Sequence, residues 1–416
     1  MKVKFETKPK IVQNNKIETI EFVFYFPIKK SNKNIHYVRL LEYILMTTSK
    51  NYTKANELEK IKKEKMLIRT NMYLTVQSKK HFIVYSFVIP KEKVIKDYNI
   101  EESFELAISL IKEPFAQNKK FNLEKFDYEK NYFLNQNKQS MENKTNQMYE
   151  EFYKIIDKKE KLGCSYEKST KYLEEITPKN LYQFYEKNIQ KNKSIKYIYG
   201  NITEEKANKL LKKYYPYKKE TFELVMDYYK KIPKLKKINV TKETSLEQNY
   251  LFLEYQIKNF KKEDIDYLRI ILGILDKKPT NLLLEKTRVE KSIVYGTELI
   301  TYVSSGIFII KAGLDEKNKQ TFIESIKEIF EQLKNKEKLK NYIEKLIKNQ
   351  EINLLKEEDS ERYALINTID EDMQELTPKK ILEIYKNVNI DILIQKVKQL
   401  ELKSTVFFRS KNDKNI

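Results

Sequence analysis

The stretch Ile176–Tyr185, ITPKNLYQFY, returns 200 residues later as Leu376–Tyr385, LTPKKILEIY. In both copies a threonine stands where it can cap a helix, and the proline after it suits the first helical position. Each copy leads towards a hydrophobic segment typical of a strand, SIKYIYG at 194–200 and STVFFRS at 404–410. The chain therefore contains an internal repeat of domain size.

Other elements repeat in the same order. The predicted pairs are two strands (17–28 and 249–257), two helices that align residue for residue (37–45 and 267–275), and two hairpins each followed by an amphipathic helix (72–90 and 295–314). We therefore expect an α+β fold of two tandem homologous domains, each an antiparallel sheet packed against helices. The expected boundaries are 1–228 and 246–416, joined by a polar, lysine-dense linker at 229–245.

Composition narrows the function classes. The 416 residues carry a formal charge of +21, but the lysines alternate with glutamates and form no separate basic block. One cysteine, Cys164, excludes an intrachain disulfide and indicates a reducing compartment. The N-terminus lacks an apolar signal core, and no apolar run is long enough for a membrane span. We expect a cytoplasmic protein that binds neither nucleic acid nor membrane.

Histidine is scarce. The chain has only His36 and His81, too far apart for a helical zinc pair, and its single cysteine excludes a cysteine-based zinc site. We expect His36 to be a solvated or capping residue before the first helix and His81 to have a structural role at a hairpin turn. No glycine-rich phosphate loop or nucleophile motif is evident.

The repeat and the helix containing RLLEY (39–43) resemble the insulinase/pitrilysin metallopeptidases, in the short form related to mitochondrial processing peptidase subunits. The resemblance implies an inverted zinc motif, H-x-x-E-H, on this helix, with a further carboxylate downstream. Arg39 and Tyr43 stand at the histidine positions, and only Glu42 is kept. In the segment resembling the family's acidic helix, the expected carboxylate pair falls on Asn135 and Gln136.

These replacements imply a non-catalytic branch that binds no cofactor itself. A guanidinium cannot ligate zinc, and a phenol is a poor substitute for imidazole. Glu42 has two open interpretations: a relic of the motif, paired with Arg39 one turn away, or an ordinary exposed helix glutamate.

The second half keeps another part of the resemblance. In LLLEKTRVEKSIVYGTEL, spacing alone indicates a surface Arg288 at a helix end and a half-buried Tyr295 at a strand start. The family's catalytic members carry an R-x6-Y pair at the corresponding place. The resemblance implies that Arg288 and Tyr295 hold the substrate backbone and stabilise the oxyanion. The glycines that usually precede this motif are replaced by DKKPT.

The family also binds substrate as an added strand on a sheet edge. The matching stretch is NMYLTVQ, in which the candidate peptide-binding positions are Asn71, Met72, Tyr73, Leu74 and Thr75. Without zinc on the chain, the alternative is an edge strand merely shielded by flanking lysines.

The resemblance thus implies a subunit of a heterodimeric zinc peptidase. The expected partners are a zinc-bearing paralogue with an intact H-x-x-E-H motif, which would hold the zinc, and an extended peptide substrate. We expect no peptidase activity from the isolated chain. Two alternatives stay open: an inactive scaffold, and a peptide-binding or maturation factor without proteolytic role.

Overall fold

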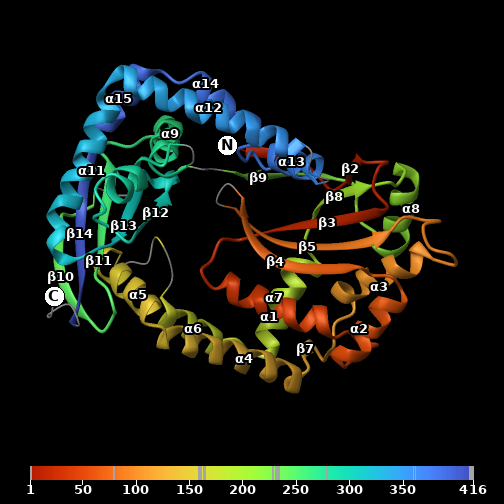
Figure 1. Cartoon of the computed structure of the whole chain (residues 1–416). Helices are drawn as coiled ribbons and strands as arrows, with labels where there is room; N and C mark the ends of the chain where they lie inside the picture. Colours follow the sequence, from red (N-terminus) through yellow and green to blue (C-terminus); the bar gives the residue numbers. More distant parts are fainter. Residues whose placement is uncertain are drawn as a thin grey trace. The chain divides into compact units, whose positions relative to one another are not determined.

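The computed structural model describes residues 2–77, 80–157, 162, 165–226, 229, 235–277, 280–358, 360 and 362–411; Cys164 and residues 230–234 of the expected linker lie outside these ranges. The chain forms two compact units (Figure 1). Unit 1 comprises Met1–Ser140, Cys164–Asp227 and Ser360–Glu375. Unit 2 comprises Met141–Gly163, Tyr228–Asp359 and Leu376–Ile416.

The two units contain sheets of the same topology. In unit 1 the spatial order is β2 (Lys10–Gln13), β8 (Ile195–Gly200), β3 (Thr19–Ile28), β5 (Lys80–Pro90) and β4 (Arg69–Gln77). In unit 2 the order is β10 (Ile238–Thr244), β14 (Leu400–Ser410), β11 (Tyr250–Ile257), β13 (Ile307–Gly313) and β12 (Gly296–Tyr302). The duplication predicted from the sequence is confirmed strand for strand.

The expectation of purely antiparallel sheets needs one correction. β2 pairs with β8 in parallel, and β10 pairs with β14 in parallel, while the other pairings are antiparallel. Each sheet is therefore mixed, because its first strand in sequence pairs with its last strand in sequence. Short alternating segments such as β10 give no sequence signal of which neighbour they join.

Helices complete both units, as Figure 1 shows. Unit 1 contains α1 (Asn34–Thr47), α2 (Ala55–Glu64), α3 (Ile100–Lys112), most of α4 (Leu123–Glu142), α6 (Tyr166–Glu174), α7 (Pro178–Tyr185), α8 (Glu204–Tyr214) and α13 (Tyr363–Asp372). Unit 2 contains α5 (Lys144–Ile156), α9 (Ile265–Asp276), α10 (Leu282–Leu284), α11 (Lys319–Lys334), α12 (Lys336–Glu358), α14 (Pro378–Lys386) and α15 (Ile390–Lys398). Small ribbons are β1 (Lys2–Glu6) with β9 (Thr221–Val225), and β6 (Ala116–Gln117) with β7 (Lys120–Phe121).

The repeated threonine–proline signal forms the helix starts that it predicts. The Thr177 side chain accepts a hydrogen bond from the Asn180 backbone N–H, and Asn180 returns one to the Thr177 N–H, so α7 begins with a full capping box. At the start of α14, the Thr377 side chain likewise accepts a hydrogen bond from the Lys380 backbone N–H, and the side chain of Lys380 cannot return one. Within the described ranges, no helix is both long and apolar enough to cross a bilayer.

Both sheets are covered on their second face by a helix from elsewhere in the sequence. β3 is buried along almost its whole length, so its sheet needs cover on both sides. In unit 1, α13 supplies it with Leu365, Ile369 and Met373. In unit 2, α5 supplies it with Met148 and Phe152. Residues 141–163, expected in the first domain, therefore belong to unit 2, and residues 360–375, expected in the second domain, belong to unit 1. In addition, β10 occupies part of the expected linker.

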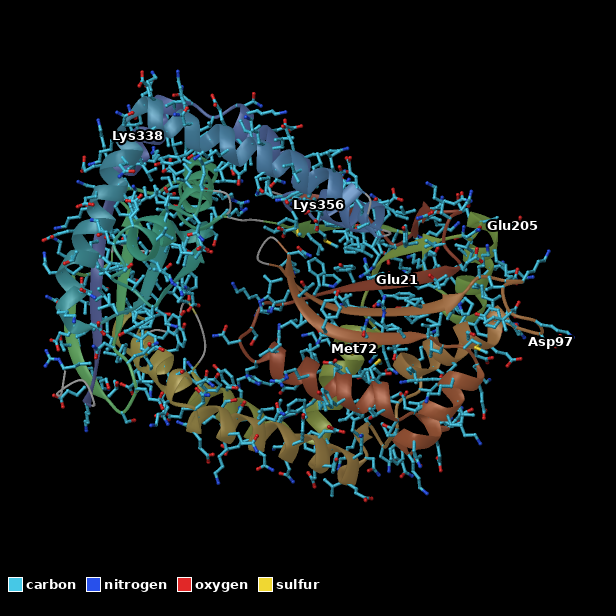
Figure 2. All side chains as sticks on the ribbon, viewed as in Figure 1. Glu21, Met72, Asp97, Glu205, Lys338 and Lys356 are labelled. Atoms are coloured by element: carbon cyan, nitrogen blue, oxygen red, sulfur yellow. The ribbon has the colours of Figure 1, made fainter. Side chains whose placement is uncertain are left out.

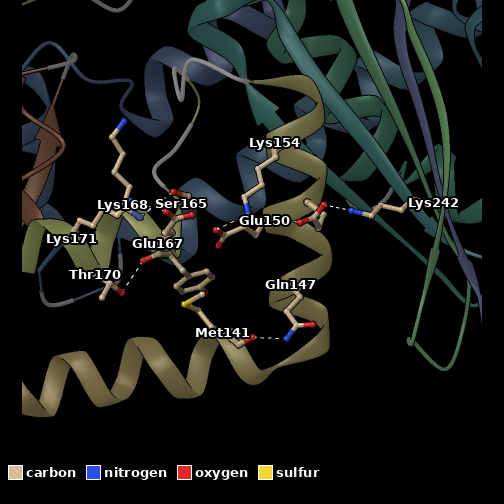
Figure 3. A network of polar contacts seen from close by, with 12 residues as sticks. Met141, Gln147, Glu150, Lys154, Ser165, Glu167, Lys168, Thr170, Lys171 and Lys242 are labelled. Atoms are coloured by element: carbon tan, nitrogen blue, oxygen red, sulfur yellow. Dashed lines mark hydrogen bonds and ion pairs between the residues drawn. The ribbon is translucent and has the colours of Figure 1, made fainter.

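Charged contacts fix these covering helices. Glu21 of β3, labelled in Figure 2, is buried and accepts two hydrogen bonds from Arg362, at 3.0 Å to Nε and 2.9 Å to Nη2. Arg69 adds a longer contact of 3.5 Å to the same carboxylate. In unit 2, Lys242 of β10 pairs with Glu151 of α5, as Figure 3 shows. The bidentate arginine contact gives α13 a defined position on the sheet.

Candidate functional site

The degenerate zinc motif lies on α1, where the structure brings Arg39 and Tyr43 together against α4. The apolar residues Leu40, Leu41, Ile44 and Leu45 of this helix are buried against unit 1, as their helical spacing predicts. On the neighbouring face, the Arg39 guanidinium carbon lies 4.4 Å from the centroid of the Phe133 ring. The Tyr43 ring packs edge-on against the same phenyl ring, with 4.9 Å between centroids.

The residues that α4 buries are Phe126, Glu129, Phe133 and Asn137, which form one helical stripe. Asn135 and Gln136 fall outside this stripe and are exposed, and Gln136 donates to Tyr132 of its own helix at 2.8 Å. The Tyr132 ring in turn lies 5.9 Å from the Tyr43 ring of α1, measured between centroids, so Tyr132 links Gln136 to the α1 motif. The placement of Asn135 and Gln136 at the metal position stays a prediction. Sequence reasoning missed Phe133 and the buried carboxylate of Glu129, although their spacing could have revealed both.

Glu42 fits neither open interpretation fully. Its side chain is half-buried, so it is not an ordinary exposed glutamate, and burial raises the pKa of its carboxyl group while the nearby Arg39 opposes that shift. Arg39 and Glu42 form no ion pair in the part of the chain that the structure describes. The guanidinium stacks on Phe133 instead of turning to the carboxylate.

The residues at this place do not fit a zinc ion. Arg39 is a fixed cation, and Phe133 fills the space between α1 and α4 with an apolar ring. Burial raises the pKa of the Tyr43 phenol, and Tyr132 adds to the rise, so the phenolate that a metal would need is disfavoured. Across the described residues, no three His, Cys, Asp or Glu side chains are grouped to hold a metal.

His36 differs from its expected solvated position. It lies within the first turn of α1, is only 5% exposed, and packs against Tyr172 with 5.8 Å between ring centroids. Burial, with a smaller contribution from Arg39, lowers the pKa of its imidazole to about 4. His81 is also buried, and its Nδ1 lies 3.2 Å from the Asn34 side-chain amide, which is the structural role predicted.

The His36 burial predicts acid sensitivity. An unfolded histidine has a pKa near 6.5, so the unfolded chain binds the proton more readily and stability is lost as pH falls from about 6.5 towards 4. We expect unit 1 to lose about 2 kcal/mol of unfolding free energy between about pH 7 and pH 5. Urea denaturation at both pH values measures this, and His36→Phe removes most of the difference. An unchanged pH dependence in the variant would contradict the assignment.

Arg288 and Tyr295 both lie on the surface of unit 2. Arg288 belongs to a π-helical turn, Glu285–Val289, and its side chain is exposed and forms no ion pair with any described residue. Tyr295 directly precedes β12 and is 56% exposed, not half-buried as its spacing alone predicts. Its backbone N–H donates to Gly313 O at 2.8 Å, and its phenol donates to Asp315. The hydroxyl is thus held at the surface by an acceptor.

The candidate peptide-binding strand is an edge strand, as predicted. β4 pairs with β5 on one side only among the described strands. Met72, labelled in Figure 2, is buried, whereas Asn71 and Tyr73 are exposed and Leu74 and Thr75 are half-buried. One edge of main-chain donors and acceptors is therefore open beside α1.

Comparisons with known proteins agree with this fold. Residues 175–350 match the family model described as the Peptidase M16 inactive domain. The probable inactive metalloprotease YmfF of Bacillus subtilis (strain 168) is 20% identical over 336 residues, which cover 78% of this chain and 77% of that protein.

Two solved structures show the same fold over nearly the full length. A conserved protein from Enterococcus faecalis V583 superposes with a TM-score of 0.78 and 18% identity, covering 97% of this chain and 96% of that one. A protease from Helicobacter pylori gives 0.68 and 15% identity, covering 98% and 99%. The resemblance drawn from the sequence is confirmed: part of the chain matches the Peptidase M16 inactive domain, one relative is a probable inactive metalloprotease, and the fold is that of M16-like structures.

Proposed function

We propose that the chain is the non-catalytic subunit of a two-chain zinc peptidase in the cytoplasm. A paralogue with an intact H-x-x-E-H motif would hold the zinc, and this chain would contribute Arg288 and Tyr295 to the bound substrate. The observation that carries the proposal is that both side chains are exposed, while the metal position on α1 holds an arginine stacked on a phenylalanine.

The two side chains suit an oxyanion. A guanidinium stays charged at every physiological pH and presents several donors, and a phenol adds one more. Asp315 now accepts the Tyr295 hydrogen bond and orients the ring. When a tetrahedral intermediate develops negative charge, the phenol can turn its donor to that oxygen. Arg288 forms no ion pair among the described residues, so it can donate to the same oxygen without breaking one.

The open edge of β4 suits an extended peptide. Main-chain hydrogen bonds along an edge strand hold a peptide almost independently of its sequence, and the alternating side chains then select it. Tyr73, 45% exposed on this strand, can contact such a peptide beside the arginine-bearing face of α1. Substrate binding can thus persist after the zinc ligands are lost.

Co-expression with the closest genomic paralogue tests the proposal. We expect peptidase activity and stoichiometric zinc in the purified pair and neither in this chain alone. A pair that assembles and cleaves without any contribution from this chain's surface residues would make the chain a scaffold. Peptide binding without turnover by the pair would make it a peptide-binding or maturation factor.

A further inference from the structure

A cavity in unit 1, away from the α1 motif, has a strongly basic lining. It lies where the C-terminus of α3, the start of β8 and the segment after α8 meet, and its volume is about 440 Å³. The charged side chains around it are five lysines and one glutamate: Lys112, Lys191, Lys193, Lys196, Lys218 and Glu220. The cavity is separate from every residue assigned to peptide recognition above.

Lys196 forms the buried wall of this cavity. It is 2% exposed, and its ammonium donates to the carbonyl oxygens of Thr7 at 2.9 Å and Ser194 at 3.2 Å. The ammonium also lies 4.1 Å from the centroid of the Tyr217 ring. Each of these partners is neutral, so they satisfy its hydrogen bonds without neutralising its charge. Burial accordingly lowers the pKa of Lys196 to about 8.

The rim is only partly neutralised. Lys193 pairs with Glu220 at 2.9 Å, and Lys191 pairs with Glu186 at 3.0 Å. Lys112, Lys196 and Lys218 form no ion pair with any residue in the described ranges. Burial lowers the pKa of Lys112 as well. Three ammonium groups that lack an ion pair among the described residues surround one cavity and create a positive potential that a bound anion would relieve.

We propose that this cavity binds a small dianionic oxyanion group of the phosphate-monoester type, held between Lys112, Lys196 and Lys218. The lysine ammonium groups supply charge-assisted donors to its oxygens. Tyr215 and Tyr217, which also line the cavity, provide ring faces for an organic group attached to the anion. The Lys196 contacts to Thr7 and Ser194 keep the inner ammonium in place before the ligand arrives.

Isothermal titration calorimetry with inorganic sulfate tests this site on the full chain. Sulfate remains a dianion across neutral and alkaline pH, so any proton taken up on binding comes from the protein. Because the anion favours the charged lysine, we expect proton uptake near pH 8, seen as heats that depend on the buffer's ionisation enthalpy. Affinity should fall as pH rises through about 8.

Paired variants of equal charge separate the site from general attraction. Lys112→Gln with Lys218→Gln should weaken sulfate binding about tenfold or more, because two ammonium groups next to the anion are lost. Lys212→Gln with Lys219→Gln removes the same charge from exposed positions outside the cavity lining and should change it less than about twofold. Equal effects of the two pairs, or no saturable binding, would overturn the proposal.

Two further titrants identify the source of the anion. Inorganic phosphate and phenyl phosphate share the dianionic group, but only the second carries an aromatic body. Tighter binding of phenyl phosphate shows that the tyrosine rings recognise an organic phosphate ester. Equal affinity shows that the site recognises the free anion. Either result supports the anion site, provided that the variant with Lys112→Gln and Lys218→Gln binds the same titrant more weakly.

Discussion

Replacing Arg288 by alanine and Tyr295 by phenylalanine in the assembled pair is expected to lower kcat/KM by about 100-fold or more. This corresponds to roughly 2.7 kcal/mol of transition-state stabilisation. The two changes remove one cationic and one phenolic donor from exposed positions, where neither supports the packing of unit 2. Assembly should therefore be unaffected while turnover falls, as steady-state kinetics with an extended peptide can measure.

Val289→Ala is the matched control for this result. Val289 follows Arg288 in the same π-helical turn and is 72% exposed, so its truncation alters the same surface without removing a donor. The control pair should retain wild-type kcat/KM. If the double variant also assembles and cleaves at the wild-type rate, the Arg/Tyr pair has no role in turnover and the scaffold interpretation takes its place.

Much of the fold is predictable from short signals in the sequence. Thr177 and Thr377 mark two helix starts because capping depends on residues within one turn. The strand and helix repeats then fix two copies of one topology. The edge position of β4 came from the family resemblance, because a hairpin alone does not decide which of its two strands lies at the sheet edge. The helix starts and the repeats rest on local chemistry or on comparison of one half of the chain with the other.

The candidate site needed three-dimensional information. Glu129 and Phe133 lie in the same acidic and aromatic segment as Asn135 and Gln136, and only the rotation of α4 decides which of these side chains are buried. A shift of two positions moves a side chain by about 200° around a helix, so an error of this size exchanges its buried and exposed faces. The expectation of a solvated His36 is wrong for a similar reason, because a residue in the first turn of a helix can lie on its buried or on its exposed face.

The sequence also did not predict that α5, from the first half of the chain, belongs to unit 2, or that α13, from the second half, belongs to unit 1. Each helix is amphipathic, which predicts that it covers an apolar surface but not which one. Both sheets bury apolar residues on two faces, so both offer such a surface. The choice depends on shape and on polar pairs such as Glu21 with Arg362, 341 residues apart in sequence.

Replacing Phe152 by alanine tests whether α5 belongs to unit 2, and we expect a large loss of stability. Phe152 is fully buried on α5 and stacks on Phe252 of β11 with 4.2 Å between ring centroids. Loss of a buried phenyl ring leaves a cavity, so we expect the free energy of unfolding of unit 2 to fall by about 3–5 kcal/mol. Urea denaturation measures the loss, and hydrogen exchange locates it: amides of β11 should exchange faster, while those of β3 should not.

Lys154→Ala provides the control on the same helix. Lys154, shown in Figure 3, is exposed and pairs with Glu150 and Glu151 of its own helix at 3.6 and 3.8 Å, so its loss should change stability by less than about 0.5 kcal/mol. Faster exchange in β3 in the Phe152 variant would place α5 on unit 1, as contiguous domain boundaries require. Faster exchange in β11 alone means that unit 2 depends on a helix encoded before the second repeat begins, so a fragment starting at residue 246 would lack the cover of its own sheet.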